Sequence, residues 1–136
     1  MTVFAFEEDD GRLTWIPMAA RRALDAAGCK LSLEAWQGMS LEARREVVRA
    51  GAEDRVDPDR VRGLLRHAEP APAPLAARPE PAPDRRPPSV AAKLPALSEA
   101  GWRRLTPLSR YVLAHLARRD RDDKLRRAYA ELRPPS

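Results

Sequence analysis

The side chains best suited to chemistry are few in this chain and lie far apart. There is one cysteine, Cys29, followed by Lys30, and there are two histidines, His67 and His115. A neighbouring lysine favours a thiolate, yet a small buried residue at a helix turn is the simpler interpretation of Cys29. No CxxC, HExxH or glycine-rich phosphate loop occurs. The sequence therefore predicts a protein that is not an enzyme and that has no metal site and no cofactor.

The elements that would position these side chains are predicted to be short helices. Alanine, leucine and arginine dominate, and runs of β-branched residues are absent, which favours an all-α class. Pro17 suits the first turn of a helix. Ser32 and Ser40 each begin the sequence SLEA, and each is expected to cap a helix. Asp57 precedes a proline and predicts a fourth helix start in residues 1–68.

A second block, residues 96–133, is predicted to hold two or three helices, with caps at Ser98 and Thr106. Between the blocks, residues 69–95 are rich in proline and alanine; nine of the 14 prolines fall within 67–95. Proline lacks the N–H that helices need, so we expect an extended linker with no helix longer than one turn over 70–95.

The seven aromatic residues all lie outside this linker. We therefore expect one domain, residues 1–136, in which the two blocks share a core that includes Trp36 and Trp102. The predicted fold is a small all-α bundle of about six or seven short helices, with an extended N-terminal arm and a Pro/Ala-rich internal linker. In the arm, Phe4 and Phe6 alternate with small residues as on one face of a strand.

Charge distribution bears on nucleic-acid binding. Residues 1–66 carry 11 basic and 12 acidic side chains, whereas residues 96–136 carry 10 and 5. The helical hairpin around Gly28 resembles a helix-turn-helix, but its second helix begins with Glu34 and offers only Gln37 for base contacts. A nucleic-acid-binding regulator with a basic C-terminal block remains the alternative hypothesis. No apolar stretch approaches the roughly 20 residues of a membrane span, and a cytoplasmic location is expected.

Four stretches of the sequence are familiar: FAFEED, LTWIPM, LDAAGCKLSLEAW and WRRLTPLSRYVLAHL. In their order and spacing they resemble the nitrate reductase associated protein family. The resemblance covers roughly residues 3–36 and 98–116. It implies a small accessory protein that supports the assembly, maturation or activity of a molybdenum-containing assimilatory nitrate reductase, and it implies no catalysis by this chain.

The motif residues also suggest which side chains would bind that partner. Taken as a group, polar residues set among aromatic anchors are typical of an interface rim, whereas for each one alone a helix cap or a surface ion pair is the favoured interpretation. The predicted partner-binding residues are Phe4, Phe6, Glu7, Pro17, Met18, Asp25, Lys30, Trp36, Trp102 and Arg110.

Overall fold

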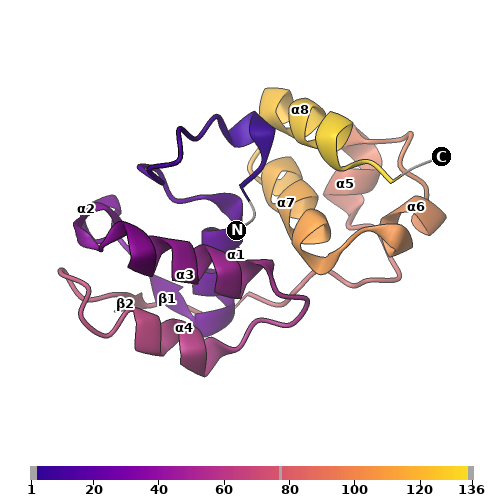
Figure 1. The fold of residues 1–136 in the computed structure, drawn as a ribbon. Coiled ribbons are helices and arrows are strands. Elements are labelled where there is room, and N and C mark those ends of the chain that lie inside the picture. The colour runs from indigo at the N-terminus through magenta and orange to yellow at the C-terminus, as the bar shows by residue number, and fades with distance from the viewer. Residues whose placement is uncertain (1–2, 77, 135–136) are drawn as a thin grey trace. The chain divides into compact units, whose positions relative to one another are not determined.

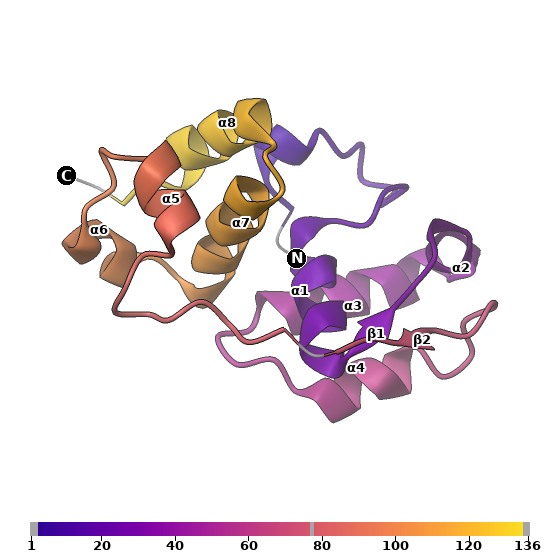
Figure 2. The ribbon, with the colours of Figure 1, turned by 180° about the vertical axis from the view of Figure 1, so that it is seen from behind.

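The computed structural model describes residues 3–76 and 78–134, and this part of the chain is predominantly helical (Figures 1 and 2). The described residues form a 3-10 turn, eight α-helices and two short strands. The turn is η1 (Ala5–Glu7), and the strands are β1 (Cys29–Lys30) and β2 (Ala73–Pro74). The helices are α1 (Met18–Ala27), α2 (Leu33–Gly38), α3 (Leu41–Ala52), α4 (Pro58–Leu64), α5 (Pro88–Lys93), α6 (Glu99–Arg104), α7 (Pro107–Arg118) and α8 (Asp122–Leu132).

The helix starts follow the predicted caps. In each case a side-chain hydroxyl accepts the backbone N–H of the residue three positions later, at 3.0 or 3.1 Å. Such a cap stabilises a helix by about 1 kcal/mol. The capping residues are Ser32, Ser40, Ser98 and Thr106. The all-α class is confirmed, with a two-residue antiparallel β1–β2 ladder as the exception within the described residues.

The chain divides into two compact units, unit 1 (Met1–Pro79) and unit 2 (Glu80–Ser136). In unit 1, α1 packs on α3 and α4. The backbones of α1 and α3 approach closely, because a Cβ at Gly51 would lie 1.6 Å from the carbonyl oxygen of Ala19. The buried guanidinium of Arg22 donates to the carbonyls of Gly51 (2.8 Å), Glu53 and Asp54 (2.9 Å). It thereby satisfies backbone acceptors at the end of α3.

In unit 2, α7 packs against α5 and α8. Lys93 at the end of α5 connects these helices, because its ammonium group donates to the carbonyl of Ala117 at 3.0 Å. The same group forms ion pairs with Asp120 and, at 3.0 Å, with Asp122. The hydrogen bond with Asp120, followed by that with Asp122, raises the pKa of Lys93 above its ordinary value. The turn between α7 and α8 is therefore held onto α5.

The proline-rich segment is more ordered than the sequence predicted. Residues Pro88–Lys93 form α5, so the expectation of no helix longer than one turn over 70–95 is wrong there. Pro88 occupies the first helical turn, where a missing N–H costs nothing. Near its start the segment runs along β1, and the N–H of Leu75 donates to the carbonyl of Gly28 at 2.9 Å.

The later part of the segment is fixed within unit 2 by α6. The indole N–H of Trp102 donates to the carbonyl of Ala82 at 2.8 Å. The Arg86 guanidinium forms an ion pair with Glu99 at 2.8 Å and also donates to the carbonyl of Leu97. That hydrogen bond from Arg86 lowers the pKa of the Glu99 carboxyl below its ordinary value. The boundary between the two units, at Pro79 and Glu80, falls between these two anchored stretches. A shared core across both blocks stays a prediction.

Candidate protein-binding site

The N-terminal arm contains a 3-10 turn over Ala5–Glu7, so the prediction of an extended arm is wrong for these three residues. The two phenyl rings nevertheless stack, with centroids 5.8 Å apart, and Phe6 is buried. The turn forms because the Glu7 carboxylate accepts the backbone N–H of Phe4 at 2.9 Å. The other oxygen of Glu7 accepts the N–H of Met18, the first residue of α1, at 2.7 Å. Since the N-cap residue Pro17 has no side-chain cap, Glu7 supplies one from a distance.

The loop between the arm and α1 is held from within by carboxylates. Asp9 accepts the N–H groups of Gly11 at 2.8 Å and of Leu13 at 3.0 Å, and Asp10 accepts that of Arg12 at 3.1 Å. Asp9 and Asp10 therefore fix the backbone of this loop by accepting its N–H groups. Short polar side chains that bond to nearby N–H groups are the usual means of fixing such a turn.

Leu13 anchors this loop through its buried side chain and its hydrogen-bonded carbonyl. Its side chain is fully buried, and its backbone lies in the left-handed region with a φ of 53°. For a leucine this conformation costs about 1–3 kcal/mol and persists only where the surroundings enforce it. Here the Leu13 carbonyl accepts both the indole N–H of Trp36 at 2.6 Å and the guanidinium of Arg44 at 3.1 Å. The next carbonyl, of Thr14, accepts the amide of Gln37 at 3.1 Å.

We call these three hydrogen bonds to the carbonyls of Leu13 and Thr14 the clamp, and the loop that contains them the clamped loop. The next residue of the loop is Trp15, and its side chain is 69% exposed. Among the described residues the other large apolar side chains that stand out as exposed are Leu75 at 46% and Leu33 at 37%. Leu33 lies one turn before Gln37 on α2, on the helix face that reaches the loop. A loop held by these hydrogen bonds thus presents an indole to solvent, and α2, which contacts the same loop through Gln37, carries a second exposed apolar side chain. We call Trp15, Leu33 and Gln37 the Trp15 surface.

The structure buries many of the side chains that the sequence put forward for partner binding. Those that are buried are Phe6, Pro17, Met18, Trp36 and Trp102; those that are half-buried are Phe4, Glu7, Asp25 and Arg110; Lys30 is exposed. Hydrogen bonds join Glu7 to Met18, and Trp36 to the loop between the arm and α1. Asp25 and Lys30 lie instead near the end of α1, and Trp102 and Arg110 belong to unit 2. In unit 2 the Arg110 guanidinium donates to the carbonyl of Leu105 at 2.6 Å.

Sequence reasoning missed Trp15 as a candidate, although the residue stands inside the LTWIPM motif. Its position two residues before Pro17 places it outside every helical stripe, so periodicity gave no reason to bury it. The absence of a predicted packing partner was the signal from which the exposure of Trp15 could have been predicted. An aromatic residue between a loop and a proline, with no helical face to join, is a candidate for exposure.

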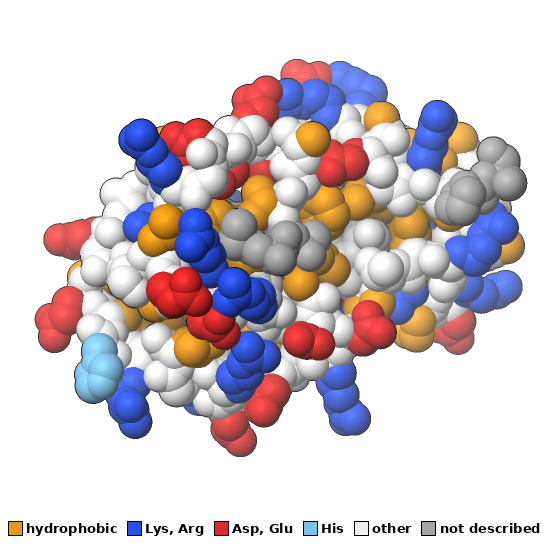
Figure 3. Space-filling model, in the orientation of Figure 1, with side chains coloured by type: hydrophobic (Ala, Val, Ile, Leu, Met, Phe, Trp, Pro, Cys, Tyr) orange, Lys and Arg blue, Asp and Glu red, His pale blue; other side chains and the backbone are white. Residues whose placement is uncertain are grey.

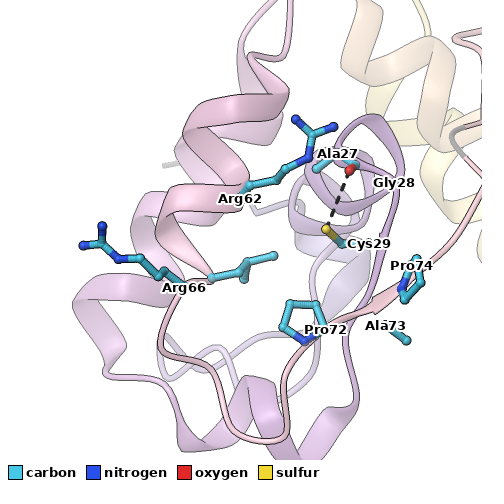
Figure 4. Close-up of a pocket in the computed structure, with 9 residues that line it drawn as sticks. Ala27, Gly28, Cys29, Arg62, Arg66, Pro72, Ala73 and Pro74 are labelled. Carbon is cyan, nitrogen blue, oxygen red and sulfur yellow. Dashed lines mark hydrogen bonds between the residues drawn. The ribbon is translucent and has the colours of Figure 1, made fainter.

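A cavity of about 330 Å³ also lies in unit 1, between α4 and the β1–β2 ladder (Figure 4). Cys29 lines it, and its thiol donates to the carbonyl of Ala27 at 3.6 Å. Arg62 lines it too but is paired with Asp59 at 2.8 Å, and Figure 4 shows the Arg66 guanidinium turned away from the thiol. No group of three or more metal-ligating side chains occurs within residues 3–76 and 78–134. The described side chains here form no catalytic constellation.

Charges of both signs are mixed on α3 and α4. Glu42 and Glu46 of α3 pair with Arg45 and Arg49 of the same helix, and Glu46 also pairs with Arg60 of α4 at 3.2 Å. Figure 3 shows basic and acidic side chains interspersed over these helices. A phosphate backbone is bound by a surface of one sign, so this face of unit 1 does not have the character of a nucleic-acid site. No helix of the described residues is long and apolar enough to cross a membrane.

Comparison of the chain with known proteins gives one finding. Neither the curated proteins nor the solved structures contain a match. The family described as conserved nitrate reductase-associated protein matches residues 3–132, which is nearly the whole chain and includes the arm, the loop before α1 and most of both units. The chain therefore belongs to the family of conserved nitrate reductase-associated proteins.

Proposed function

We propose that this protein is a non-catalytic, cytoplasmic accessory protein that binds a molybdenum-containing assimilatory nitrate reductase and supports its assembly, maturation or activity. The family description supports the link to nitrate reductase. The observation that supports a binding role is the exposure of Trp15. The loop that carries it is fixed by hydrogen bonds from the side chains of Trp36, Arg44 and Gln37.

The energetics of the Trp15 surface favour a protein partner. Burying a large apolar side chain is worth about 1.5–3 kcal/mol, and tryptophan is among the residues most enriched at interface hot spots. Because the loop is already fixed by the clamp at Leu13, binding would not have to order it, and that preserves affinity. Gln37 and the exposed Glu34 of α2 would form part of the polar rim.

The experiment is to add the purified protein to nitrate reductase that has been produced without it, and to follow complex formation and nitrate reduction together. We expect a complex, and a gain in enzyme activity or in the yield of active enzyme. The variant Trp15→Ala should weaken both, while Leu75→Ala, which truncates an exposed apolar side chain elsewhere in unit 1, should weaken neither. Failure of the wild-type protein to bind nitrate reductase at any stage of its maturation would overturn the proposal.

A further inference from the structure

Unit 2 contains a cavity of about 600 Å³ between α6 and the C-terminal end of α8. Its wall carries two arginines, Arg104 from the last turn of α6 and Arg133 directly after α8. Ser98 and Tyr129 add a hydroxyl group each. None of the described residues that line it is acidic.

Among the described residues the two arginines of the wall have no partner, whereas some other arginines of the unit do. Arg86 is paired with Glu99 at 2.8 Å, and Arg126 is paired with Asp123. Arg104 and Arg133 are exposed and make no side-chain hydrogen bond or ion pair within the described part of the chain. Because the described wall carries no acidic side chain, an anion in the cavity would supply the counter-charge that these two guanidinium groups lack.

The hydroxyl groups suit the same kind of ligand. Ser98 Oγ accepts the backbone N–H of Gly101 at 3.0 Å, which leaves the hydroxyl hydrogen to be donated elsewhere. Tyr129 is half-buried and contributes a second hydroxyl to the wall. The polar side chains of the lining are therefore all able to donate hydrogen bonds, and they need a ligand that accepts several at once.

We propose that this cavity binds an oxyanion group, of the carboxylate or phosphate class. Arginine matches such groups because its planar fork can donate two parallel hydrogen bonds to two oxygens. The net charge of unit 2 also favours anion binding. Residues 80–136 carry 13 basic and 7 acidic side chains, and the resulting positive electrostatic field attracts anions. The oxyanion could be a free small ion or an acidic side chain of another protein. The site lies in a different unit from the Trp15 surface and does not rest on the proposed function.

The test is a titration of the full-length protein followed by NMR, with ionic strength held constant by chloride. The probes are inorganic phosphate and a hexapeptide of glutamate, and the reporters are the backbone amides of Ser98 and Gly101. We expect saturable shifts of these two amides with at least one probe. Tighter binding of the peptide would assign the site to acidic protein segments, and tighter binding of phosphate would assign it to free oxyanions.

Two double variants separate a built site from general attraction. Arg104→Gln with Arg133→Gln should weaken binding of the better probe at least about tenfold, because charge-assisted hydrogen bonds are lost. Arg85→Gln with Arg119→Gln removes the same charge from exposed arginines of unit 2 outside the cavity, and it should change binding less than threefold. The proposal is overturned if neither probe gives saturable shifts at Ser98 and Gly101, or if the two double variants lose affinity equally.

Discussion

Glu7 and Met18 are joined across 11 residues by a hydrogen bond of 2.7 Å from the backbone N–H of Met18 to the Glu7 carboxylate. This bond ties the N-terminal turn to the first turn of α1, where N–H groups have no partner within the helix. The intervening loop, which ends just before Pro17, is thereby closed at its base. Trp15 lies in the loop that this bond and the hydrogen bonds to the Leu13 carbonyl hold in place.

Removing the Glu7 carboxylate should therefore lower the stability of the protein. Glu7→Ala leaves the N–H groups of Phe4 and Met18 without this acceptor, and we expect a loss of about 1–2 kcal/mol in the free energy of unfolding. Glu34→Ala is the matched control, because Glu34 is an exposed first-turn acid whose loss should cost no more than about 0.5 kcal/mol. Urea unfolding followed by far-UV circular dichroism measures both. Equal effects of the two variants would contradict the capping role of Glu7.

The close approach of α1 and α3 makes Gly51 intolerant of any side chain. With a Cβ only 1.6 Å from the Ala19 carbonyl oxygen, Gly51→Ala must push the two backbones apart. We expect a destabilisation of at least about 1–3 kcal/mol, measured by thermal unfolding. Gly63→Ala in α4 is the control, since no atom lies within 4 Å of its added Cβ; it should stabilise by about 0.5–1 kcal/mol. A neutral Gly51→Ala would show that the helices do not meet there.

The ion pair of Arg86 and Glu99 should make stability depend on acid pH. The Arg86 hydrogen bond lowers the pKa of Glu99 in the folded state below its ordinary value of 4.5. A lowered pKa contributes stability that is present above pH 4.5 and is lost as the pH falls through the folded-state pKa. Arg86→Gln should thus be less stable than wild type at pH 7, and the difference should shrink as the pH drops below 4.5.

Unfolding midpoints in urea at a series of pH values from 7 to 3 measure this effect. Arg85→Gln serves as the control, because Arg85 is the exposed neighbour of Arg86 and makes no ion pair within the described residues. It should follow the wild-type pH profile. A difference between Arg86→Gln and wild type that stays constant over the whole pH range would contradict the assignment to Glu99.

How far the sequence determined the fold is clearest from the helix caps. Ser32 and Ser40 act on residues three positions away, and such local chemistry can be read from a single stretch. The bond from Met18 to Glu7 links residues that no periodicity relates, so it could not be predicted from the sequence. Arg22 shows the same limit, since a buried arginine is only tolerable when carbonyls of a distant helix end accept its hydrogen bonds.

The proline-rich segment differs from the prediction for another physical reason. The number of prolines alone predicted an extended linker, but Pro88 stands in the first helical turn, where the N–H has no partner within the helix, and α5 contains no second proline. The candidate site was partly predictable. The motif around residues 4–36 was identified, while the exposure of Trp15 depends on a left-handed Leu13, which no propensity favours.

Limited proteolysis should locate the part of the proline-rich segment that is not anchored. Elastase cuts after small residues, and we expect its first cut after Ala76, which is exposed and follows the last bond to β1 at Leu75. Ala91 and Ala92, which lie in α5 and are not followed by proline, should resist. Mass spectrometry of the earliest fragments identifies the site, and first cuts after Ala91 or Ala92 would contradict the expected order.

The same digest tests the prediction of a single domain. If Trp36 and Trp102 belong to one shared core, the two fragments should stay together on size-exclusion chromatography without denaturant. Fragments that elute separately, each still helical by circular dichroism, would show that the two blocks are independent domains.

The most direct test of the central claim is the dissociation constant of purified nitrate reductase for the wild-type protein, for Trp15→Ala and for Leu75→Ala. Both truncated side chains are exposed, so the free energy of unfolding should change by no more than about 0.5 kcal/mol in either variant. We expect Trp15→Ala to raise the dissociation constant by about 30-fold or more, as for a hot spot of about 2 kcal/mol, and Leu75→Ala to leave it within about threefold. A Trp15→Ala protein that binds nitrate reductase as tightly as wild type would contradict the account.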